Sequence, residues 1–237
     1  MKIVITGEGG FLGTHLTHYF RNRSEFELIA LGRNYLDSGD KFKKADYLIH
    51  AASIHRDADP EVVYLKNMEI HKELVSFLAA NSLRTNIIFI SSIQEYLDNP
   101  YGRSKAEGKL LFQKFCEQAG SKFISHALPN LFGPGAKPHH TSFIATFCYN
   151  LHANIPCHYN TNEVNLCFVD DAVKEIGRLK EAVFNTTKTT VRDVYYLLFG
   201  FKEQLLLNKT PSVSSDFERN LLTTFLSYKN YKIKDLN

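Results

Sequence analysis

The sequence predicts an α/β protein built on a doubly wound parallel sheet, followed by a small carboxy-terminal lobe. Short apolar strands alternate with amphipathic helices from residue 1 to about residue 128, and a glycine-rich run follows the first strand directly. This alternation is the pattern of a Rossmann-type sheet with helices on both faces. From residue 132 the pattern changes to loops and helices, and we expect this part to form the lobe.

The first strand, Lys2–Thr6, leads into Gly7, and an apolar helical run follows at Phe11–Phe20. Gly7 permits a tight turn, Gly10 lets the backbone approach an anion, and Gly13 lets the helix pack on the strand. The N–H groups at the start of this helix favour a phosphate. The run therefore predicts the pyrophosphate site of a dinucleotide cofactor, with contacts from Thr6, Gly7, Gly10, Phe11, Leu12 and Gly13.

The second strand, Phe26–Leu31, ends in LGRN. An acid here would hold the ribose 2′-hydroxyl of NAD, whereas an arginine can hold the 2′-phosphate of NADP. Arg33 therefore favours NADPH over NADH, unless it is a solvated surface charge. The third strand ends in Ala51 and Ala52, which are small where the backbone must pass close to the cofactor. Leu128, at the end of the fifth strand, is a further candidate cofactor contact.

The fourth strand, Ile87–Ser92, ends in two serines, and an amphipathic helix runs from Tyr101 to about Gln118. Tyr101 and Lys105 are four residues apart and lie on one face of this helix. A lysine ammonium lowers the pKa of a neighbouring phenol, so Tyr101 could give or take a proton near neutral pH. A nearby serine hydroxyl would hold the reacting oxygen.

The GxxGxxG spacing, read together with the YxxxK pair, resembles the extended short-chain dehydrogenases/reductases, a group that includes the NAD-dependent epimerase/dehydratase family. The resemblance implies that Lys105 also holds the cofactor ribose. It implies that the catalytic serine is Ser92 rather than Ser91, because Ser92 stands four residues before Tyr96. Asn67 matches an asparagine that supports the lysine through water in these enzymes; the alternative is an exposed helix residue.

Dehydratases of this family carry an Asp and a Glu directly after the catalytic hydroxyl, whereas Ile93 and Gln94 follow Ser92 here. Elimination of water therefore has no evident acid/base pair. Four stretches resemble, more specifically, the reductase domain of bifunctional capsular-polysaccharide enzymes: DNPYGRSKAEGKLL, LPNLFGPGAKP, SFIATFCYNL and FVDDAV. This resemblance implies NADPH-dependent reduction of a 4-keto-6-deoxy nucleotide sugar, linked to UDP or dTDP, in capsule or O-antigen synthesis.

Two departures from those enzymes concern the substrate. They continue into a cupin epimerase domain, whereas the sequence here ends at Asn237, so we expect any epimerisation to come from a separate partner acting before it. Ala127 stands where they usually have arginine, and His139 and His140 replace family residues, so the sugar stays open. The resemblance implies substrate contacts from Ser92, Gln94, Asn130, Lys137, Ser142 and Phe143, although Asn130 also fits a turn.

We expect one extended unit over residues 1–237. Residues 1–131 should form mainly the NADP-binding part, with return segments near 165–189, and residues 132–164 and 190–237 the substrate lobe. Asp170 and Asp171 are interpreted as helix-capping residues rather than catalytic groups. A homodimer through paired helices is expected from the resemblance alone.

Composition excludes several classes of function. The chain has 237 residues, 44% hydrophobic and 22% charged, enough for one sizeable core. A net charge of +3 without a basic block argues against nucleic-acid binding. The sequence shows no signal peptide and no apolar run of ~18 residues, so we expect a cytoplasmic protein without membrane contact. The cysteines and histidines lack zinc-like spacing, so no metal is expected.

Two other functions stay open. A 4-epimerase would retain NAD, return the hydride to the other face of the sugar and consume no cofactor, but Arg33 argues against it. A non-catalytic regulator would bind NADPH without turnover. Such proteins often lose the tyrosine or the lysine, and this chain keeps both.

Overall fold

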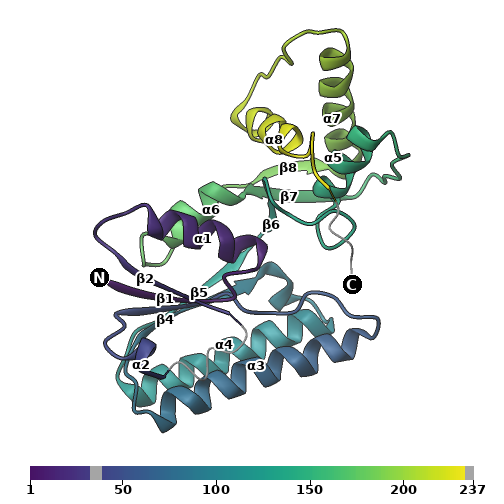
Figure 1. Ribbon diagram of the computed structural model, residues 1–237. Helices are drawn as coiled ribbons and strands as arrows, with labels where there is room; N and C mark the ends of the chain where they lie inside the picture. Colours follow the sequence, from purple (N-terminus) through teal and green to yellow (C-terminus); the bar gives the residue numbers. More distant parts are fainter. Residues whose placement is uncertain (33–38, 233–237) are drawn as a thin grey trace. The chain divides into compact units, whose positions relative to one another are not determined.

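The computed structural model describes residues 1–32 and 39–232, and it divides into two compact units (Figure 1). Unit 1 comprises Met1–Leu128 and Val173–Val183. Unit 2 comprises Pro129–Ala172 and Phe184–Asn237.

Unit 1 is built on a five-stranded sheet in the order β2-β1-β3-β4-β5. Every neighbouring pair of strands is parallel, which confirms the predicted doubly wound sheet. The strands are β1 (Lys2–Thr6), β2 (Glu27–Leu31), β3 (Tyr47–His50), β4 (Asn86–Ser92) and β5 (Phe123–Leu128).

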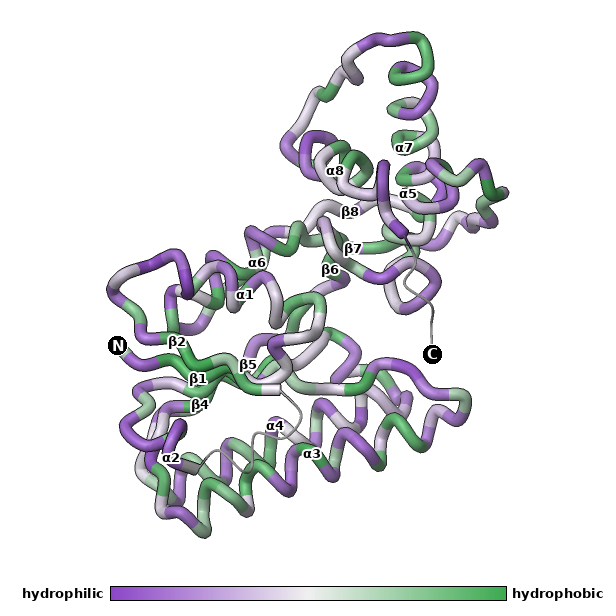
Figure 2. Tube along the Cα trace, viewed as in Figure 1, coloured by the Kyte–Doolittle hydropathy of each residue, from purple (hydrophilic) through white to green (hydrophobic). Residues whose placement is uncertain are grey.

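Helices cover both faces of this sheet. Helix α1 (Phe11–Arg21) lies on one face, and α3 (Pro60–Ala80) and α4 (Pro100–Ala119) pack side by side on the other (Figure 1). The short α2 (Gly39–Phe42) precedes β3. Figure 2 shows hydrophobic residues along β1 and β2 and alternating hydrophobic and hydrophilic residues along α3 and α4. Strands covered on both faces are apolar throughout, whereas each covering helix needs one apolar face.

The starts of α3 and α4 are fixed by side-chain caps. Asp59 accepts a hydrogen bond from the N–H of Glu61 at 2.9 Å, and Asn99 accepts one from the N–H of Gly102 at 2.8 Å. A proline follows each cap, at the first helical position, where its missing N–H costs nothing. Tyr101 therefore lies in the first turn of α4.

The strand order places a switch point between β1 and β3. The chain passes from β1 to β2 on one side and then returns past β1 to form β3. Thr6, which ends β1, pairs in register with His50, which ends β3. Ligands of doubly wound sheets bind beyond the carboxyl ends of the strands at such a point. The turn at Gly7 and the residues after His50 lie at this edge.

Unit 2 contains a three-stranded sheet in the order β6-β7-β8. Strands β6 (Asn130–Phe132) and β7 (Glu163–Phe168) are parallel, and β7 and β8 (Thr187–Thr190) are antiparallel. The helices of this unit are α5 (Phe143–Ala153), α7 (Val191–Leu206) and α8 (Asp216–Ser227). Helix α6 (Val169–Ile176) begins in unit 2 and ends in unit 1.

Within the predicted return segments near 165–189, β7 does not join the first sheet, because it pairs with β6 and β8 instead. Pro129 separates β5 from β6, and a proline donates no hydrogen bond to a ladder, so the first sheet stops there. An apolar strand pattern does not reveal which sheet the strand joins. The segment that does return to unit 1 is Val173–Val183, where a Cβ on Gly177 would lie 2.3 Å from the Tyr19 ring of α1.

Asp170 and Asp171 lie in the first turn of α6, where carboxylates stabilise a helix amino terminus, and their role as caps stays a prediction. Within residues 1–32 and 39–232, no helix is long and apolar enough to cross a membrane. The same ranges contain no group of three or more His, Cys, Asp or Glu side chains that could hold a metal ion.

Candidate active site

Two glycines shape the turn after β1 because a side chain would not fit there. Gly7 has a φ of +81°, and a Cβ on it would lie 2.6 Å from the backbone nitrogen of Ala52. A Cβ on Gly13 would lie 2.0 Å from the carbonyl oxygen of Gly7. The turn therefore packs directly on α1 and on the residues after β3, where Ala51 donates to the carbonyl oxygen of Thr6 at 3.1 Å.

The amino end of α1 is open to a ligand. Gly9 and Gly10 are exposed, and Gly10 as the N-cap has no side chain to satisfy the first N–H groups of the helix. Phe11 and Leu12 in the first turn are half-buried, and this turn holds no acidic residue. N–H groups at a helix start, without a competing carboxylate, fit the diphosphate of a dinucleotide.

Two predicted cofactor contacts, Thr6 and Leu128, have buried side chains. Thr6 is fully buried and its hydroxyl is 2.7 Å from Nδ1 of His50, so its side chain supports the turn from the core. Leu128 is buried at the end of β5. Arg33 lies outside the described residues.

Tyr101 and Lys105 lie one turn apart on α4. The ammonium of Lys105 donates to the carbonyl oxygen of Ile90 at 3.0 Å and lies 5.6 Å from the centre of the Tyr101 ring. Lys105 is 2% exposed, whereas Tyr101 is half-buried. The lysine is therefore held inside unit 1, and the tyrosine lies between it and the surface.

Burial sets the protonation of both groups. It lowers the pKa of Lys105 to about 7. It raises the pKa of Tyr101 to about 12, against a smaller lowering by a hydrogen bond with Ser53. Burial is thus the largest influence on the pKa of Tyr101, and the lowering of this pKa by Lys105 stays a prediction. Tyr101 keeps its proton at neutral pH, and Lys105 is divided between its charged and neutral forms.

The two serines at the end of β4 have different partners. The hydroxyl of Ser91 donates to the carboxylate of Glu95, and Ser91 is buried. Ser92 is half-buried and caps the short 3-10 helix η2 (Ile93–Tyr96), where its hydroxyl oxygen accepts from the N–H of Gln94 at 3.2 Å. This bond leaves the hydroxyl hydrogen of Ser92 for another acceptor, so the geometry favours Ser92 over Ser91 as the substrate-binding serine.

Glu95 ties η2 to α4, a role that the sequence did not indicate. Its side chain is 3% exposed and accepts from the ammonium of Lys109 at 2.9 Å as well as from Ser91. Burial would raise the pKa of Glu95, but these two donors lower it below its usual value. Gly102 provides a second close contact between α4 and η2. A Cβ on it would lie 2.1 Å from the carbonyl oxygen of Gln94, so only a glycine allows η2 to pack this closely.

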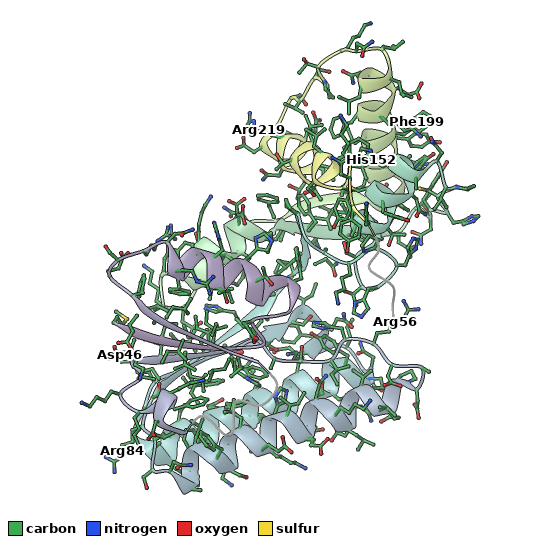
Figure 3. The ribbon with its side chains drawn as sticks, viewed as in Figure 1. Asp46, Arg56, Arg84, His152, Phe199 and Arg219 are labelled. Atoms are coloured by element: carbon green, nitrogen blue, oxygen red, sulfur yellow. The ribbon has the colours of Figure 1, made fainter. Side chains whose placement is uncertain are left out.

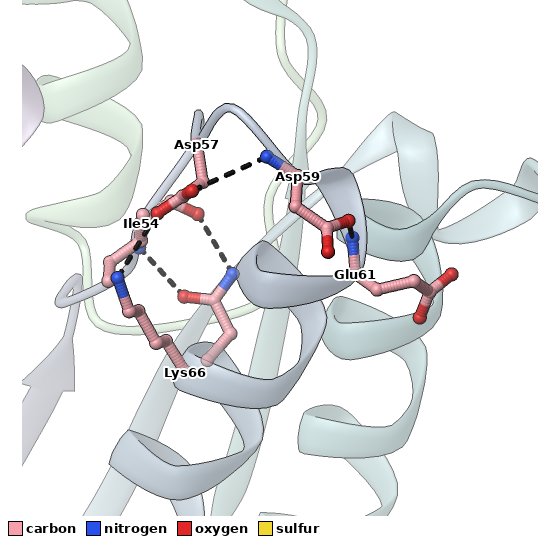
Figure 4. A network of polar contacts seen from close by, with 6 residues as sticks. Ile54, Asp57, Asp59, Glu61 and Lys66 are labelled. Carbon is pink, nitrogen blue, oxygen red and sulfur yellow. Dashed lines mark hydrogen bonds and ion pairs between the residues drawn. The ribbon is translucent and has the colours of Figure 1, made fainter.

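Asn67 is fully buried, so the alternative of an exposed helix residue is wrong. Its side-chain oxygen accepts from the N–H of Ile54 at 2.7 Å, and its amide nitrogen donates to the carbonyl oxygen of Ile54 at 2.8 Å. The same nitrogen donates to the hydroxyl of Ser104 at 3.2 Å. Figure 4 shows the polar network around Ile54, including the ion pair of Asp57 and Lys66. The water-mediated support of Lys105 stays a prediction.

Two further residues contact Tyr101 from the loop after β3. The Ser53 side chain hydrogen-bonds the phenol, and the His55 ring lies with its centre 5.1 Å from the centre of the Tyr101 ring. Arg56 follows on the same loop as an exposed cation (Figure 3). Sequence reasoning missed Ser53 and His55; their position directly after a strand, at the carboxyl edge of the sheet, was the available signal.

A buried pair of histidines links β3 to α3 in the core of unit 1. Nε2 of His50 is 3.0 Å from Nδ1 of His71, and Nδ1 of His50 is 2.7 Å from the hydroxyl of Thr6. Burial, with a smaller effect from the charge of Lys105, lowers the pKa of His50 to about 3. The pair is therefore neutral at physiological pH and joins Thr6, at the start of the glycine turn, to α3.

The remaining predicted substrate contacts belong to unit 2. Asn130 begins β6 and Lys137 lies on the loop after it, and both side chains are exposed. Ser142 caps α5 by accepting from a backbone N–H of the first turn at 3.2 Å. Phe143 packs edge-on against Phe147 with ring centres 5.6 Å apart. Ser142 and Phe143 thus contribute to local structure, and the substrate roles of all four stay predictions.

The sequence matches the NAD dependent epimerase/dehydratase family over residues 3–190. It is similar to the UDP-2-acetamido-2,6-beta-L-arabino-hexul-4-ose reductase of Pseudomonas aeruginosa, with 29% identity over 96% of this chain. It is also similar to the capsular polysaccharide assembling protein CapF of Staphylococcus aureus, with 32% identity, a TM-score of 0.85 and 96% of this chain covered. The structure of RMD from Pseudomonas aeruginosa complexed with NADPH shares the fold, with a TM-score of 0.78, 18% identity, and 97% of this chain and 100% of that chain covered.

The Pseudomonas reductase and CapF are both longer than the part of them that this chain matches. The similarity extends over nearly all of this chain, but the chain spans 65% of the length of the Pseudomonas reductase and 66% of that of CapF.

Proposed function

Because the chain belongs to the NAD-dependent epimerase/dehydratase family, we propose that it is an NADPH-dependent reductase of a 4-keto-6-deoxy nucleotide sugar in surface polysaccharide biosynthesis. The observation that carries the proposal is the pairing of the half-buried Tyr101 with the buried Lys105, in the unit that also holds the open helix start of α1. The substrate class is supported by two relatives, a reductase of a UDP-linked 4-ulose and a capsular polysaccharide assembling protein.

The side chains of unit 1 suit protonation of a carbonyl oxygen. Tyr101, with a pKa of about 12, holds its proton at neutral pH and can donate it as the oxygen gains negative charge. The phenolate that remains is stabilised by the ammonium of Lys105, since opposite charges attract strongly in a buried site. The hydroxyl of Ser92 donates to the same oxygen and orients it. A bound nicotinamide cofactor would supply the hydride.

Elimination of water lacks the groups it needs. Ile93 and Gln94 follow Ser92, and neither is an acid or a base. Glu95 is the next carboxylate along the chain, but its oxygens are occupied by Ser91 and Lys109. Elimination of water removes a proton from one sugar carbon and adds a proton to the hydroxyl that leaves the next carbon, so it needs a free acid/base group, and the site favours reduction.

We propose NADPH as the cofactor on the strength of Arg33, which follows β2 in the sequence. One observation favours NAD instead. The carboxylate of Glu8 lies beside Gly32, so that a Cβ on Gly32 would be 3.0 Å from Oε1 of Glu8. A carboxylate at the end of the second strand can hold a ribose 2′-hydroxyl. The same observation makes a 4-epimerase that retains NAD the second candidate function.

The proposal includes a cytoplasmic homodimer. Exposed apolar side chains on the paired helices of unit 1 support the dimer, since Leu65 on α3 is 61% exposed and Leu110 on α4 is 64% exposed. Light scattering after size-exclusion chromatography tests this part directly. A monomer at micromolar concentration would contradict it.

The activity is tested by mixing the purified protein with NADPH and a UDP-4-keto-6-deoxy-N-acetylhexose, made in place by a dehydratase, and following the absorbance of the reduced cofactor. NADH is assayed in parallel. Tyr101→Phe removes the proton donor and should abolish the oxidation of NADPH. The matched control is Tyr96→Phe, since Tyr96 lies nearby in sequence but is 73% exposed.

Oxidation of NADPH that is lost in Tyr101→Phe and kept in Tyr96→Phe is the expected result. Faster oxidation of NADH than of NADPH would overturn the cofactor assignment alone. Conversion of the sugar without consumption of either cofactor would overturn the reductase in favour of the epimerase.

A further inference from the structure

We propose that the loop after β3 is a positioning device for Tyr101, in which Ser53 and His55 hold the phenol ring and Asn67 holds the loop. The inference rests on the proposed function, because it concerns the tyrosine that donates the proton there.

The His55 ring packs on the Tyr101 ring. The ring centres are 5.1 Å apart and the ring planes are inclined by 33°. His55 is exposed and Tyr101 is half-buried, so the imidazole shields part of the phenol ring from solvent. An aromatic ring in contact with the phenol ring limits how far the phenol can rotate, because the two rings would otherwise collide.

Ser53 fixes the hydroxyl end of the same side chain through its hydrogen bond with Tyr101. Ser53 directly follows Ala52, whose backbone nitrogen would lie 2.6 Å from a Cβ on Gly7. The start of the loop is thereby packed against the glycine turn. The phenol is held by its face and by its hydroxyl, both from one loop.

Asn67 fixes the middle of this loop. Ile54 lies between Ser53 and His55, and Asn67 binds both its N–H, at 2.7 Å, and its carbonyl oxygen, at 2.8 Å. The carboxamide thus satisfies both backbone groups of Ile54, as a neighbouring strand would. Because Asn67 is fully buried, water does not compete for these bonds.

The network returns to Tyr101 through the backbone of α4. The amide nitrogen of Asn67 also donates to the hydroxyl of Ser104, and that hydroxyl donates to the carbonyl oxygen of Tyr101 at 2.7 Å. One buried side chain therefore links the main chain of Tyr101 to the loop that touches its ring. A change at Asn67 would move both together.

The outer part of the loop is anchored to α3 as well. Asp57 accepts from the ammonium of Lys66 at 3.1 Å and from the N–H of Asp59 at 3.4 Å (Figure 4). His55 thus lies between two anchored points, Ile54 and Asp57. A loop fixed on both sides can hold a ring in one place, which is what a positioning role requires.

The kinetic test compares His55→Ala, which removes the ring, with His55→Phe, which keeps a ring and cannot carry a proton. We expect His55→Ala to lower kcat by roughly tenfold to a hundredfold, as misplacement of a reacting group does, with little change in the KM for NADPH. His55→Phe should restore most of the rate and leave the pH profile unchanged. The matched control is His18→Ala, an exposed histidine on α1.

Two kinetic results would overturn the proposal. A His55→Ala enzyme as fast as the parent would show that the ring contact is without effect. A His55→Phe enzyme as slow as His55→Ala, with an altered pH profile, would show that the imidazole transfers a proton instead of positioning the tyrosine.

An NMR measurement that needs no enzymatic turnover tests this inference independently of the proposed function. In protein carrying ¹³Cζ-tyrosine, the Tyr101 resonance is identified by its loss in Tyr101→Phe. His55→Ala should shift that resonance and His55→Phe should shift it less, while Ser53→Ala should raise the pH at which it titrates. An unmoved Tyr101 resonance in both His55→Ala and Ser53→Ala overturns the inference. If the Tyr101 resonance shifts as expected but the protein reduces no sugar, the inference stands and only the proposed function is overturned.

Discussion

The ammonium of Lys105 lies 5.6 Å from the centre of the Tyr101 ring while it donates to the carbonyl oxygen of Ile90. Burial shifts both pKa values toward the neutral forms, to about 7 for the lysine and about 12 for the tyrosine. The pair is therefore a phenol that keeps its proton beside a cation that can lose its charge at physiological pH. Both properties have measurable consequences.

The rate of reduction should fall as the pH rises through about 7, because Lys105 loses its charge there while Tyr101 stays protonated. Without the ammonium, the phenolate left after proton donation is less stable. We expect kcat/KM, measured between about pH 5.5 and 9, to show one ionisation on its alkaline side. Lys105→Arg keeps a permanent charge and should move that limb to higher pH, at a lower maximal rate. If the alkaline side of the kcat/KM profile stays at the same pH in Lys105→Arg, the ionisation belongs to a group other than Lys105.

Replacement of Lys105 by methionine should stabilise the fold at acidic pH while removing activity. The folded pKa of about 7 lies below the unfolded value of ~10.4, so the unfolded chain binds more protons between these pH values. Stability of the parent protein therefore rises with pH across this window, and the full cost of burying the charge is present below it. At pH ~6, Lys105→Met should gain on the order of 5 kcal/mol in the free energy of unfolding, less what the lost hydrogen bond to Ile90 contributed. Urea denaturation checks this, and a variant less stable than the parent at that pH refutes it.

Glu95→Ala should lower both stability and kcat. It leaves the ammonium of Lys109 and the hydroxyl of Ser91 without their buried acceptor, which costs roughly 1–3 kcal/mol. It also frees η2 from α4, so kcat should fall more than the KM for NADPH rises. Glu95→Gln keeps an acceptor and should do less harm. Glu117→Ala, at an exposed position of α4, is the control and should change stability by less than about 0.5 kcal/mol. If Glu95→Ala and Glu117→Ala changed stability and kcat equally, Glu95 would not link η2 to α4.

Gly102→Ala should destabilise the fold although alanine is the better helix former. Its Cβ would lie 2.1 Å from the carbonyl oxygen of Gln94, so η2 must move away from α4. We expect a loss of roughly 1–3 kcal/mol in thermal or chemical denaturation. Gly200→Ala on α7 is the matched control, because a Cβ there meets nothing within 4 Å. It should instead stabilise by about 0.5–1 kcal/mol. A gain in both variants would contradict the close packing of η2 on α4.

Local patterns were enough to predict the parallel sheet, the glycine turn and the helix that carries Tyr101 and Lys105. Each depends on neighbours in sequence: an apolar run, a glycine spacing, or a separation of four residues. The sheet to which β7 belongs was mispredicted, because strand pairing depends on contacts that the pattern of one strand does not specify.

The interactions around the tyrosine could not be predicted, because they join residues far apart in the chain. His50 meets His71 across 21 positions and Asn67 meets Ser104 across 37. A single histidine or asparagine carries no spacing signal for such a contact. The burial that raises the pKa of Tyr101 is hidden for a related reason, because it depends on how distant parts of the chain pack around the side chain.

The central claim is that this protein delivers a hydride to a sugar carbonyl carbon, and its most direct test follows that hydrogen. The protein is given the 4-keto nucleotide sugar with NADPH deuterated at nicotinamide C4, and the product is analysed by mass spectrometry and NMR. The account predicts one deuterium at sugar C4 for each NADPH consumed. A product without deuterium, formed while NADPH is untouched, would contradict it.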